Sequence, residues 1–551
     1  MTETASASAI APSRTVAGAG ASAIAPSRTV AVVGTGTMGQ GIAQVALVAG
    51  HPVRLYDAVP GRAREAADAL AGRLERLVDK GRMDGAARDA ALGRLHPAAD
   101  LADLAELADA ALVVEAVLEQ LPVKQELFTA LEAVVADDCL LATNTSSLSV
   151  TAIAGALTHP GRFVGLHFFN PAPLLPLVEV VSGHATDEAA ATRAYETAKA
   201  WGKTPVRCTD TPGFIVNRIA RPFYAEAFAV YEERGADPAT IDAVLRECGG
   251  FRMGPFELTD LIGQDVNEAV TRSVWESFFQ SPKFAPSLAQ RRLVESGLHG
   301  RKSGRGWYAY ETPGAPAAPA PAAPAAPGAA RTGGAPSKEV GRPEPHTAPP
   351  AKAPAAVTVV GDLGPARELV AMMTEAGIDV TSVNDGGPYI ELPGDGQLVP
   401  ADGKTSVEFA DVVYFDLALD YRGATRIALS ASEDTSERAV AEAVGLFQKL
   451  GKEVSVIGDV PGMIVARTVA MLVDLAADAV AKGVATPEDI DTAMRLGVNY
   501  PLGPVEWNRR LGQDWAYDLL SALHERCPTG RYAPSLALYR QAYAGDQETG
   551  S

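Results

Sequence analysis

Cysteine is scarce in this sequence. The four residues among 551, Cys139, Cys208, Cys248 and Cys527, lie far apart and form none of the paired spacings of zinc sites or redox motifs. A large chain without a cysteine framework is typical of a reducing compartment. We therefore expect a cytoplasmic protein with no metal site.

Long apolar runs and positive charge are also lacking. No segment approaches the roughly 20 apolar residues needed to cross a membrane. The N-terminus has no basic region followed by an apolar core, so we expect no signal peptide. Lys and Arg number 48 against 67 Asp and Glu, and the formal net charge is −19. This balance argues against nucleic acid and anionic membranes as partners.

The length, with 47% hydrophobic residues, is enough for several domains, each with its own core. The first 28 residues are an exception, because the segment ASAIAPSRTVA occurs from Ala7 to Ala17 and again, letter for letter, from Ala21 to Ala31. This repeat indicates a local duplication of the coding segment. We expect residues 1–28 to form a disordered tail, in which only the second copy continues into a strand.

A glycine-rich turn follows the apolar run from Thr29 to Val33 and precedes a helical pattern. This strand–turn–helix context is the one that the dinucleotide fingerprint requires. In it, Gly34 makes the tight turn, Gly36 lets backbone approach the pyrophosphate, and Gly39 lets the helix pack on the strand. The helix N-terminus faces the phosphates, and we place Met38, at its start, among the cofactor contacts.

A second apparent strand ends at Asp57, 18 residues after Gly39 (57 − 39). A carboxylate at this place accepts hydrogen bonds from the ribose hydroxyls and repels a 2′-phosphate. We therefore expect NAD as the cofactor. Arg54 and Arg62, which are close in the sequence, leave NADP as an alternative.

One histidine and one glutamate, 12 residues apart (179 − 167), are embedded in apolar runs that read as buried strands. A carboxylate in such a run needs a partner, because burying an unpaired charge costs several kcal/mol. If His167 is that partner, Glu179 fixes the orientation of a general base. The alternative is a core histidine and an edge-strand glutamate that never meet.

Small polar residues occur at the end of the apparent strand from Cys139 to Thr143, where Asn144, Ser146 and Ser147 follow. Open α/β sheets bind ligands at the carboxyl ends of their strands. Ser146 or Ser147 can also be the N-cap of a helix. Further on, Asn217 falls among apolar helical residues, and a buried amide of this kind must be hydrogen-bonded.

Eight segments together resemble the 3-hydroxyacyl-CoA dehydrogenase family, of the 3-hydroxybutyryl-CoA dehydrogenase type. They are GTGTMG at Gly34, VVEAVLEQLPVKQELF at Val113, TNTSSL at Thr143, GLHFFNP at Gly165, LVEVV at Leu177, DTPGFIVNR at Asp210, GPFELTDLIG at Gly254 and GRKSGRGWYAY at Gly300. These segments occur in the family's order and spacing, from about Thr29 to Tyr310. Their combination is specific to the family, although no single segment is.

The resemblance implies NAD-dependent oxidation of a (3S)-3-hydroxyacyl-CoA. His167 takes the 3-hydroxyl proton while hydride leaves C3, and Glu179 orients and polarises His167. Ser146 and Asn217 hydrogen-bond the substrate oxygen. Long members of the family often act on 3-hydroxyadipyl-CoA in the degradation of phenylacetate or related aromatic compounds. The resemblance therefore leaves two substrates open, 3-hydroxybutyryl-CoA in fatty-acid metabolism and 3-hydroxyadipyl-CoA in phenylacetate catabolism.

The resemblance also implies contacts around the cofactor and the CoA. It places Asn144 and Lys124 on the cofactor side and Glu115 near the nicotinamide ribose and the domain interface. Lys80 matches a family position near the CoA phosphates.

Beyond an Ala/Pro-rich stretch, the chain repeats itself. The segment from Pro461 to Arg467 mirrors Pro212 to Arg218 at an offset of 249 residues (461 − 212), and several later positions match at the same offset. Asn217 then corresponds to Ala466 and Glu179 to Ala428, so the copy lacks the chemistry. Upstream, Val357 to about Val456 reads as a shortened nucleotide-binding fold without a cofactor site. In it, Ala410–Phe415 resembles Ala110–Glu115.

The expected fold is therefore an α/β Rossmann-type domain and an all-α domain, followed by a degenerate repeat of both. The predicted boundaries are a tail at 1–28, an NAD-binding domain at 29–208, an all-α domain at 209–311, a flexible linker at 312–356, a degenerate Rossmann-like domain at 357–458 and a second all-α domain at 459–545. We expect the two all-α domains to pack against each other, much as two subunits pack in single-copy family dimers. A homodimer of the whole chain is the alternative.

Two other functions are weighed against this interpretation. A β-hydroxyacid dehydrogenase acting on a free acid usually relies on a lysine base in its helical domain, whereas the histidine and glutamate fit the CoA type. A non-catalytic dinucleotide-binding protein is disfavoured because the first half retains His167, Glu179, Ser146 and Asn217.

Overall fold

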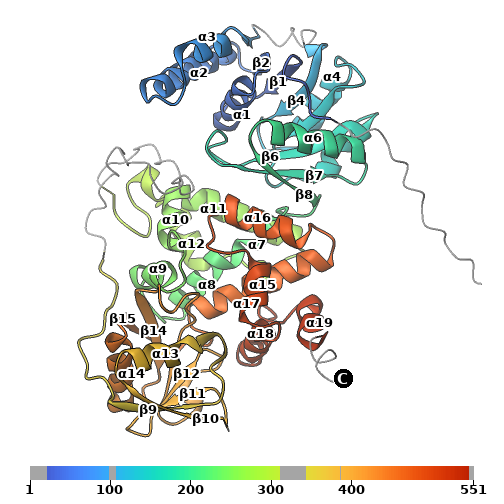
Figure 1. Cartoon of the computed structure of the whole chain (residues 1–551). Coiled ribbons are helices and arrows are strands. Elements are labelled where there is room, and N and C mark those ends of the chain that lie inside the picture. The colour runs from blue at the N-terminus through green and yellow to red at the C-terminus, as the bar shows by residue number, and fades with distance from the viewer. Residues whose placement is uncertain (1–21, 99–106, 311–342, 385, 545–551) are drawn as a thin grey trace, which may run out of the picture.

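The structure is a computed structural model that describes residues 22–98, 107–310, 343–384 and 386–544. Two Rossmann-type sheets lie at opposite ends of the molecule, and helical domains from both halves of the chain lie between them (Figure 1). Residues 1–21 and 311–342, which hold most of the predicted tail and much of the predicted linker, lie outside the described residues.

The first sheet has eight strands in the order β3-β2-β1-β4-β5-β6-β7-β8, and all neighbours are parallel except β6 and β7. Its near-continuous Val, Leu and Ala runs are buried on both faces, as expected for a sheet covered by helices on both sides. The strands are β1 Thr29–Val33, β2 Val53–Tyr56, β3 Leu95–Pro97, β4 Ala110–Glu115, β5 Leu140–Thr143, β6 Phe163–Phe168, β7 Leu177–Ser182 and β8 Thr204–Thr209. Its helices are α1 Thr37–Val48, α2 Arg62–Asp79, α3 Gly85–Leu92, α4 Leu121–Glu132, α5 Val150–Ala154 and α6 Glu188–Ala200.

The end of the predicted tail is ordered rather than disordered. Ile24 is 4% exposed and fills a place in the core of the first sheet. Its N–H donates to Thr197 Oγ1 at 3.0 Å, and the Arg28 guanidinium pairs with Asp138. The prediction of disorder over residues 22–28 was wrong because it gave no weight to the apolar side chain of Ile24.

The first helical domain is made of short helices that follow β8 directly. They are α7 Val216–Ile219, α8 Arg221–Glu232, α9 Pro238–Glu247, α10 Pro255–Ile262, α11 Gln264–Ser277 and α12 Leu288–Glu295. Pro lies in the first turn of α8, α9 and α10, where its missing N–H costs no helical hydrogen bond.

The second half repeats this plan with a smaller sheet, ordered β10-β9-β11-β12-β13-β14-β15. Its strands and helices are β9 Ala356–Val360, α13 Glu368–Glu375, β10 Asp379–Val383, β11 Tyr389–Glu391, β12 Gln397–Pro400, β13 Val412–Phe415, β14 Arg426–Ala431, α14 Glu437–Lys449 and β15 Glu453–Ile457. The second helical domain consists of α15 Val465–Ala481, α16 Pro487–Gly497, α17 Pro504–Leu511, α18 Trp515–Arg526 and α19 Leu536–Ala544.

Strand pairing corrects one correspondence between the halves. β13 pairs antiparallel with β14, and β14 is parallel to β15, which is the arrangement of β6, β7 and β8. Ala410–Phe415 is therefore the counterpart of the β6 region, and its predicted likeness to Ala110–Glu115 was wrong. Alternating small apolar residues fit either strand, and only the pairing tells them apart.

The two halves pack on each other reciprocally. Helix α16 of the second half lies against β7 and β8, while α9 of the first half lies against β14, the counterpart of β7. The Thr209 N–H donates to Val484 O at 2.9 Å, and the Gly458 N–H donates to Gly235 O at 2.8 Å. At the 249-residue offset, the donor of one hydrogen bond corresponds to the donor of the other (458 − 209), and the two acceptors correspond in the same way (484 − 235). The halves are thus related as in a two-fold dimer, in which each contact occurs twice.

The chain that leads into the second sheet is held against the protein. In the described part of the predicted linker, the His346 N–H donates to Thr240 Oγ1 at 2.8 Å, and the Ala351 N–H donates to the Gln448 side chain at 2.8 Å. The Ala348 N–H also donates to Val454 O in β15 at 2.7 Å. This stretch is thus held against α9, α14 and the second sheet and is not the free spacer that its composition predicts.

Candidate active site

The glycine turn has the shape that a dinucleotide site needs. Gly34 has φ +93°, and a Cβ there would lie 2.5 Å from Ala116 O. A Cβ on Gly39 would lie 1.8 Å from Gly34 O, so only glycine lets α1 approach β1 this closely. A Cβ on Gly36 would meet nothing within 4 Å. Its lack of a side chain leaves the first N–H groups of α1 open for a pyrophosphate, and half-buried Met38 lies in that turn.

Asp57 is held at the carboxyl end of β2. Its Oδ2 accepts from Thr35 N at 2.9 Å and from Thr35 Oγ1 at 2.6 Å, and its Oδ1 accepts from Val59 N at 3.0 Å. Although burial works in the opposite direction, these hydrogen bonds lower the pKa of Asp57, so the carboxylate stays ionised. Arg54, which left NADP as an alternative, lies 3.6 Å from the Asp109 carboxylate.

The predicted His/Glu pair exists in the structure. His167 and Glu179 are direct partners across the antiparallel β6–β7 pair, and His167 Nδ1 lies 2.6 Å from Glu179 Oε2. His167 is 5% exposed and Glu179 is fully buried. The alternative, in which the two side chains never meet, is therefore excluded.

The helical domain completes the pair. Glu179 Oε1 accepts hydrogen bonds from the N–H groups of Ile215 at 3.1 Å and Val216 at 2.9 Å, at the start of α7. Both carboxylate oxygens are thereby satisfied. The next residue is half-buried Asn217, whose side-chain amide makes no hydrogen bond to another described residue. The same backbone turn thus holds Glu179 and presents Asn217.

The pairing also assigns the two nitrogens of the imidazole. Because the Glu179 carboxylate accepts a hydrogen bond from Nδ1 of His167, the neutral imidazole carries its proton on Nδ1. Its Nε2 is then free to accept a hydrogen bond. The rings of Phe169 and Phe214 lie beside the imidazole, with centroids 4.5 Å and 5.7 Å away. The arrangement is that of a general base in an apolar pocket with one nitrogen available to a substrate.

The polar residues after β5 lie beside the pair. Asn144 Oδ1 accepts from Phe168 N at 2.9 Å, so this residue ties the end of β5 to the strand that carries His167. Ser146 follows it and is half-buried. Neither Ser146 nor Ser147 is the helix N-cap that was the alternative, because Ser149 caps α5 by accepting from Ala152 N.

Glu119 is a residue of this site that the sequence analysis missed. One of its oxygens accepts from Thr145 Oγ1 at 2.6 Å and from the N–H groups of Ser146 and Ser147 at 3.0 and 3.1 Å. Burial raises its pKa, but Lys124 and these hydrogen bonds outweigh that effect and lower it. The signal in the sequence was a second carboxylate four residues after Glu115, next to a strand end rich in donors.

Glu115 and Lys124 form a buried ion pair. Glu115 is fully buried, and its oxygens accept from Lys124, from Thr143 Oγ1 at 2.6 Å and from Val117 N at 2.6 Å. Lys124 is 1% exposed and also lies 3.2 Å from Glu119. Glu119 is the partly exposed carboxylate of the group, whereas Glu115, which we expected near the nicotinamide ribose and the domain interface, is enclosed with Lys124.

Lys80 is not brought together with the other site residues. It is exposed at the end of α2, which packs beside β2 and β3, whereas the His/Glu pair lies on β6 and β7. The α2–α3 hairpin that carries it stands out from the sheet (Figure 1).

The second half replaces the pair with one carboxylate. At the 249-residue offset, His167 corresponds to Asp416 (416 − 167) and Glu179 to Ala428. Asp416 Oδ2 accepts from Ile464 N and Val465 N at 3.0 and 2.8 Å, which are the counterparts of the donors to Glu179. Burial raises the pKa of Asp416 to about 6, against hydrogen bonds that lower it. A carboxylate that accepts backbone hydrogen bonds thus occupies the place of the imidazole.

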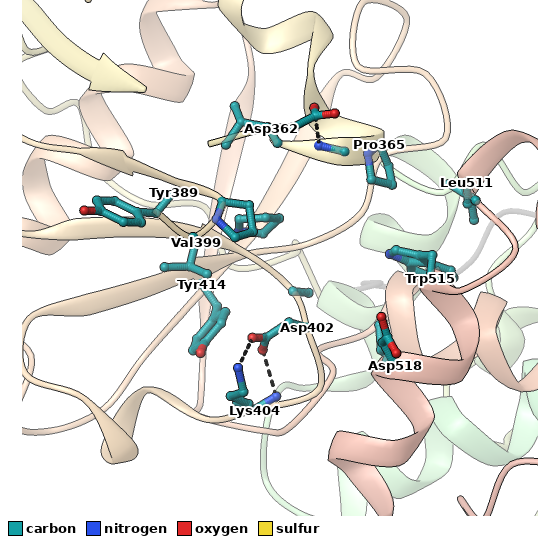
Figure 2. A pocket seen from close by; sticks show the side chains of 18 of the residues that line it. Asp362, Pro365, Tyr389, Val399, Asp402, Lys404, Tyr414, Leu511, Trp515 and Asp518 are labelled. Atoms are coloured by element: carbon teal, nitrogen blue, oxygen red, sulfur yellow. Dashed lines mark hydrogen bonds and ion pairs between the residues drawn. The ribbon is translucent and has the colours of Figure 1, made fainter. Parts of the chain in front are cut away.

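The second half nevertheless contains a cavity of about 670 Å³. It lies between the carboxyl ends of β9 and β12 and the turn from α17 to α18, and its wall includes Tyr389, Tyr414 and Trp515 (Figure 2). Asp402 is hydrogen-bonded to Lys404 beside it. Within the described residues its lining contains no histidine, asparagine or serine, so it lacks the groups that surround His167.

Two negative findings concern the described residues. Within them no helix combines the length and apolar character needed to cross a membrane. In the same part of the chain, no group of three or more His, Cys, Asp or Glu side chains is arranged to hold a metal ion.

Family models match most of the described chain. The model for the NAD binding domain of 3-hydroxyacyl-CoA dehydrogenase covers residues 29–211, and the model for the C-terminal domain of that enzyme matches twice, at 213–310 and 462–550. Residues 398–461 match the reduced Rossmann-fold domain of 3-hydroxybutyryl-CoA dehydrogenase. The predicted repeat of both domains, with a degenerate second sheet, is confirmed.

Similar proteins agree with these matches. The chain is 40% identical to the 3-hydroxyadipyl-CoA dehydrogenase of Escherichia coli K12, over 92% of this chain and 96% of that protein. It is 41% identical to a 3-hydroxybutyryl-CoA dehydrogenase of Mycobacterium tuberculosis, over 50% of this chain and 96% of that protein. A crystal structure described as 3-hydroxybutyryl-CoA dehydrogenase from E. coli K12 superposes with a TM-score of 0.82 and 40% identity, covering 95% of this chain and 99% of that chain. With its glycine turn, Asp57 and buried His/Glu pair, this chain belongs to the family of NAD-dependent 3-hydroxyacyl-CoA dehydrogenases.

Proposed function

We propose that this chain oxidises a (3S)-3-hydroxyacyl-CoA to the 3-ketoacyl-CoA, with His167 as the general base and Glu179 as the residue that positions it. The observation that carries the proposal is the 2.6 Å contact from His167 Nδ1 to Glu179, which leaves Nε2 for the substrate hydroxyl. The N–H groups of Ile215 and Val216 hold Glu179 in place.

The residues of the site have distinct tasks. His167 Nε2 takes the proton of the 3-hydroxyl group, and Glu179 stabilises the imidazolium that forms. Ser146 and Asn217, on either side of the domain boundary, donate hydrogen bonds to the substrate oxygen. The open first turn of α1, Asp57 and Glu119 would hold the pyrophosphate and ribose groups of NAD, which would supply the hydride acceptor.

The preferred acyl group in this proposal is dicarboxylic, as in 3-hydroxyadipyl-CoA. The long E. coli relative that is named for this substrate matches the chain over both halves. Relatives named for 3-hydroxybutyryl-CoA match one half of the chain, although a two-half crystal structure also carries that name. The reaction would then serve the cytoplasmic degradation of aromatic acids such as phenylacetate.

The test is an assay of the purified full chain by NADH absorbance. The substrates are 3-hydroxybutyryl-CoA, 3-hydroxyhexanoyl-CoA and 3-hydroxyadipyl-CoA, each with NAD or NADP. We expect NAD-dependent oxidation of all three and the highest kcat/KM for the adipyl thioester. Oxidation of free 3-hydroxy acids in preference to the thioesters would contradict the proposal and favour the β-hydroxyacid dehydrogenase alternative.

We also propose that one chain supplies both helical domains and acts as a monomer. The support is the reciprocal packing of α16 on β7 and β8 and of α9 on β14. Light scattering on the purified chain should give the mass of one chain, 57.3 kDa. A stable dimer in this measurement would contradict the proposal that the chain acts as a monomer.

A further inference from the structure

Arg221, the first residue of α8, is buried without a negatively charged partner. It is 5% exposed. Its side chain donates a single hydrogen bond to another described residue, from Nη1 to Thr271 Oγ1 at 3.1 Å, and its buried Nε has no partner. No carboxylate of the described residues lies within ion-pair distance. Burial lowers the pKa of the guanidinium, which indicates that the charged form is poorly solvated there.

Other arginines of this interface that are buried or largely buried are compensated. The Arg218 guanidinium donates to Asp478 at 2.7 Å. Arg467 pairs with Glu226 and Glu233, and Arg531 pairs with Glu226. Because a buried charge is normally paired, the lack of an acid beside Arg221 indicates that its partner comes from outside the chain.

Arg221 lies one helical turn beyond the candidate catalytic amide. Asn217 is four residues earlier (221 − 217), and Ala220 between α7 and α8 has right-handed helical angles, so the two positions share one side of the helical path. One turn advances about 5.4 Å. In a six-carbon dicarboxylic chain, three bonds of about 1.5 Å separate C3 from the terminal carboxyl carbon. The spacing matches a substrate whose C3 lies at Asn217 and whose far end lies at Arg221.

Arg221 has polar neighbours, whereas the corresponding positions in the other half of the chain are apolar. Thr271 accepts the hydrogen bond of the Arg221 guanidinium. Tyr500, which belongs to the second half, interacts with the charge of Arg221. The buried Tyr500 hydroxyl has no hydrogen-bond partner among the described residues. At the 249-residue offset, the three counterparts are Ala470, Leu520 and Phe251, all apolar. If these polar residues served only to stabilise the fold, we would expect polar residues at the corresponding positions of the other half as well.

We propose that Arg221 binds the terminal carboxylate of a dicarboxylic 3-hydroxyacyl chain, with the Tyr500 hydroxyl as a second donor. This subsite rests on the proposed function, because it places C3 of the thioester between His167 and Asn217. It assigns part of the substrate specificity to a pair of residues drawn from the two halves of the chain. Tyr224, whose ring lies under the guanidinium with 5.1 Å to its centroid, holds Arg221 in position.

The test compares 3-hydroxyadipyl-CoA with two six-carbon analogues, its terminal carboxamide and 3-hydroxyhexanoyl-CoA. In the unmodified full chain, kcat/KM should be at least about tenfold higher for the carboxylate than for the amide. Arg221→Met should lower the adipyl/hexanoyl ratio of kcat/KM by about a hundredfold, mainly through KM for the adipyl substrate. Tyr500→Phe, which keeps the ring and is the milder change, should lower the same ratio by about tenfold.

Arg531→Met is the control, because it removes a largely buried arginine, with 14% side-chain exposure, from the same interface between the helical domains. It should weaken folding but leave the adipyl/hexanoyl ratio unchanged. Equal losses on both substrates in Arg221→Met, or no preference for carboxylate over amide in the unmodified chain, would overturn the subsite while leaving the proposed function intact. Failure of the unmodified chain to oxidise any of these thioesters would overturn the proposed function itself.

Discussion

The two halves of this chain use different residues to accept hydrogen bonds from the backbone N–H groups at the start of a helix. In both, a helix begins after the sheet with backbone N–H groups that point at a buried strand end. The first half meets them with Glu179, which also holds His167. The second half meets them with Asp416 at the place of the histidine itself. Both halves thus keep a buried carboxylate that accepts from these N–H groups, whereas the first half adds the imidazole that we propose as the general base.

Replacing His167 by Gln should have the largest effect of any single change. Removal of the general base should lower kcat by about 10²–10⁴-fold, while binding of NADH, measured by its fluorescence, stays nearly the same. Asp416→Asn, the change at the corresponding place, should lower stability but leave kcat per folded molecule within about twofold. If the two variants lost activity equally, the halves would not be divided into a catalytic and a structural one.

The interface between the halves should be the next most sensitive place. Glu226 is fully buried and accepts hydrogen bonds from Arg467, Arg531 and Tyr532, all contributed by the second half. Glu226→Gln leaves two buried cations poorly paired and should lower the free energy of unfolding by about 3–5 kcal/mol.

Urea unfolding, followed by circular dichroism, measures this loss. Glu233→Gln is the control, because that side chain also contacts Arg467 but is 36% exposed, and it should cost about 1 kcal/mol or less. Losses of similar size in the two variants would show that the buried pair does not join the halves.

Asp416 should give the second half an unusual dependence on pH. Its folded pKa is about 6, above the ordinary value of 3.8, so between these values the folded chain holds a proton that the unfolded chain has lost. Its contribution to stability should therefore fall by about 2 kcal/mol as pH rises from 4 to 6. The measurement is the difference in unfolding free energy between the unmodified chain and Asp416→Asn across this range. A difference that stays constant with pH would contradict the prediction.

The smallest of these effects should come from making the cofactor turn of the first half resemble that of the second. Asp57 follows β2, whereas Asn384 follows β10, its counterpart. Asp57→Asn keeps the shape but loses the charge that repels a 2′-phosphate, so the preference for NAD over NADP should fall about tenfold. Kinetic constants with both cofactors test this, and an unchanged preference would show that Asp57 does not contact the ribose.

Local patterns were sufficient to predict the chemistry of the first half. The glycine turn, Asp57 and the His/Glu pair each lie at a strand end or in a strand, where side-chain direction follows from position. His167 and Glu179 face each other because of the register of β6 on β7. The sequence shows only two apolar runs there and does not give this register.

Properties that depend on distant partners could not be predicted in this way. Glu115 looked like a cofactor contact until the fold enclosed it with Lys124. The role of Asp416 was hidden because β13 was matched to the wrong strand. Arg221 has an ordinary place in a helical pattern, and only the packed structure shows that no carboxylate of the described residues pairs with it.

The reciprocal contacts between α9, α16 and the two sheets have an evolutionary consequence. In a dimer of identical subunits, every mutation appears on both sides of the axis, so a change that helps one side must be tolerated on the other. Fusion of the copies into one polypeptide removes that constraint. Phe251 and Tyr500, whose rings meet with centroids 5.1 Å apart, are counterparts that have already diverged. The second half can therefore change independently of the first, and in our proposal its Tyr500 forms part of the substrate site of the first half.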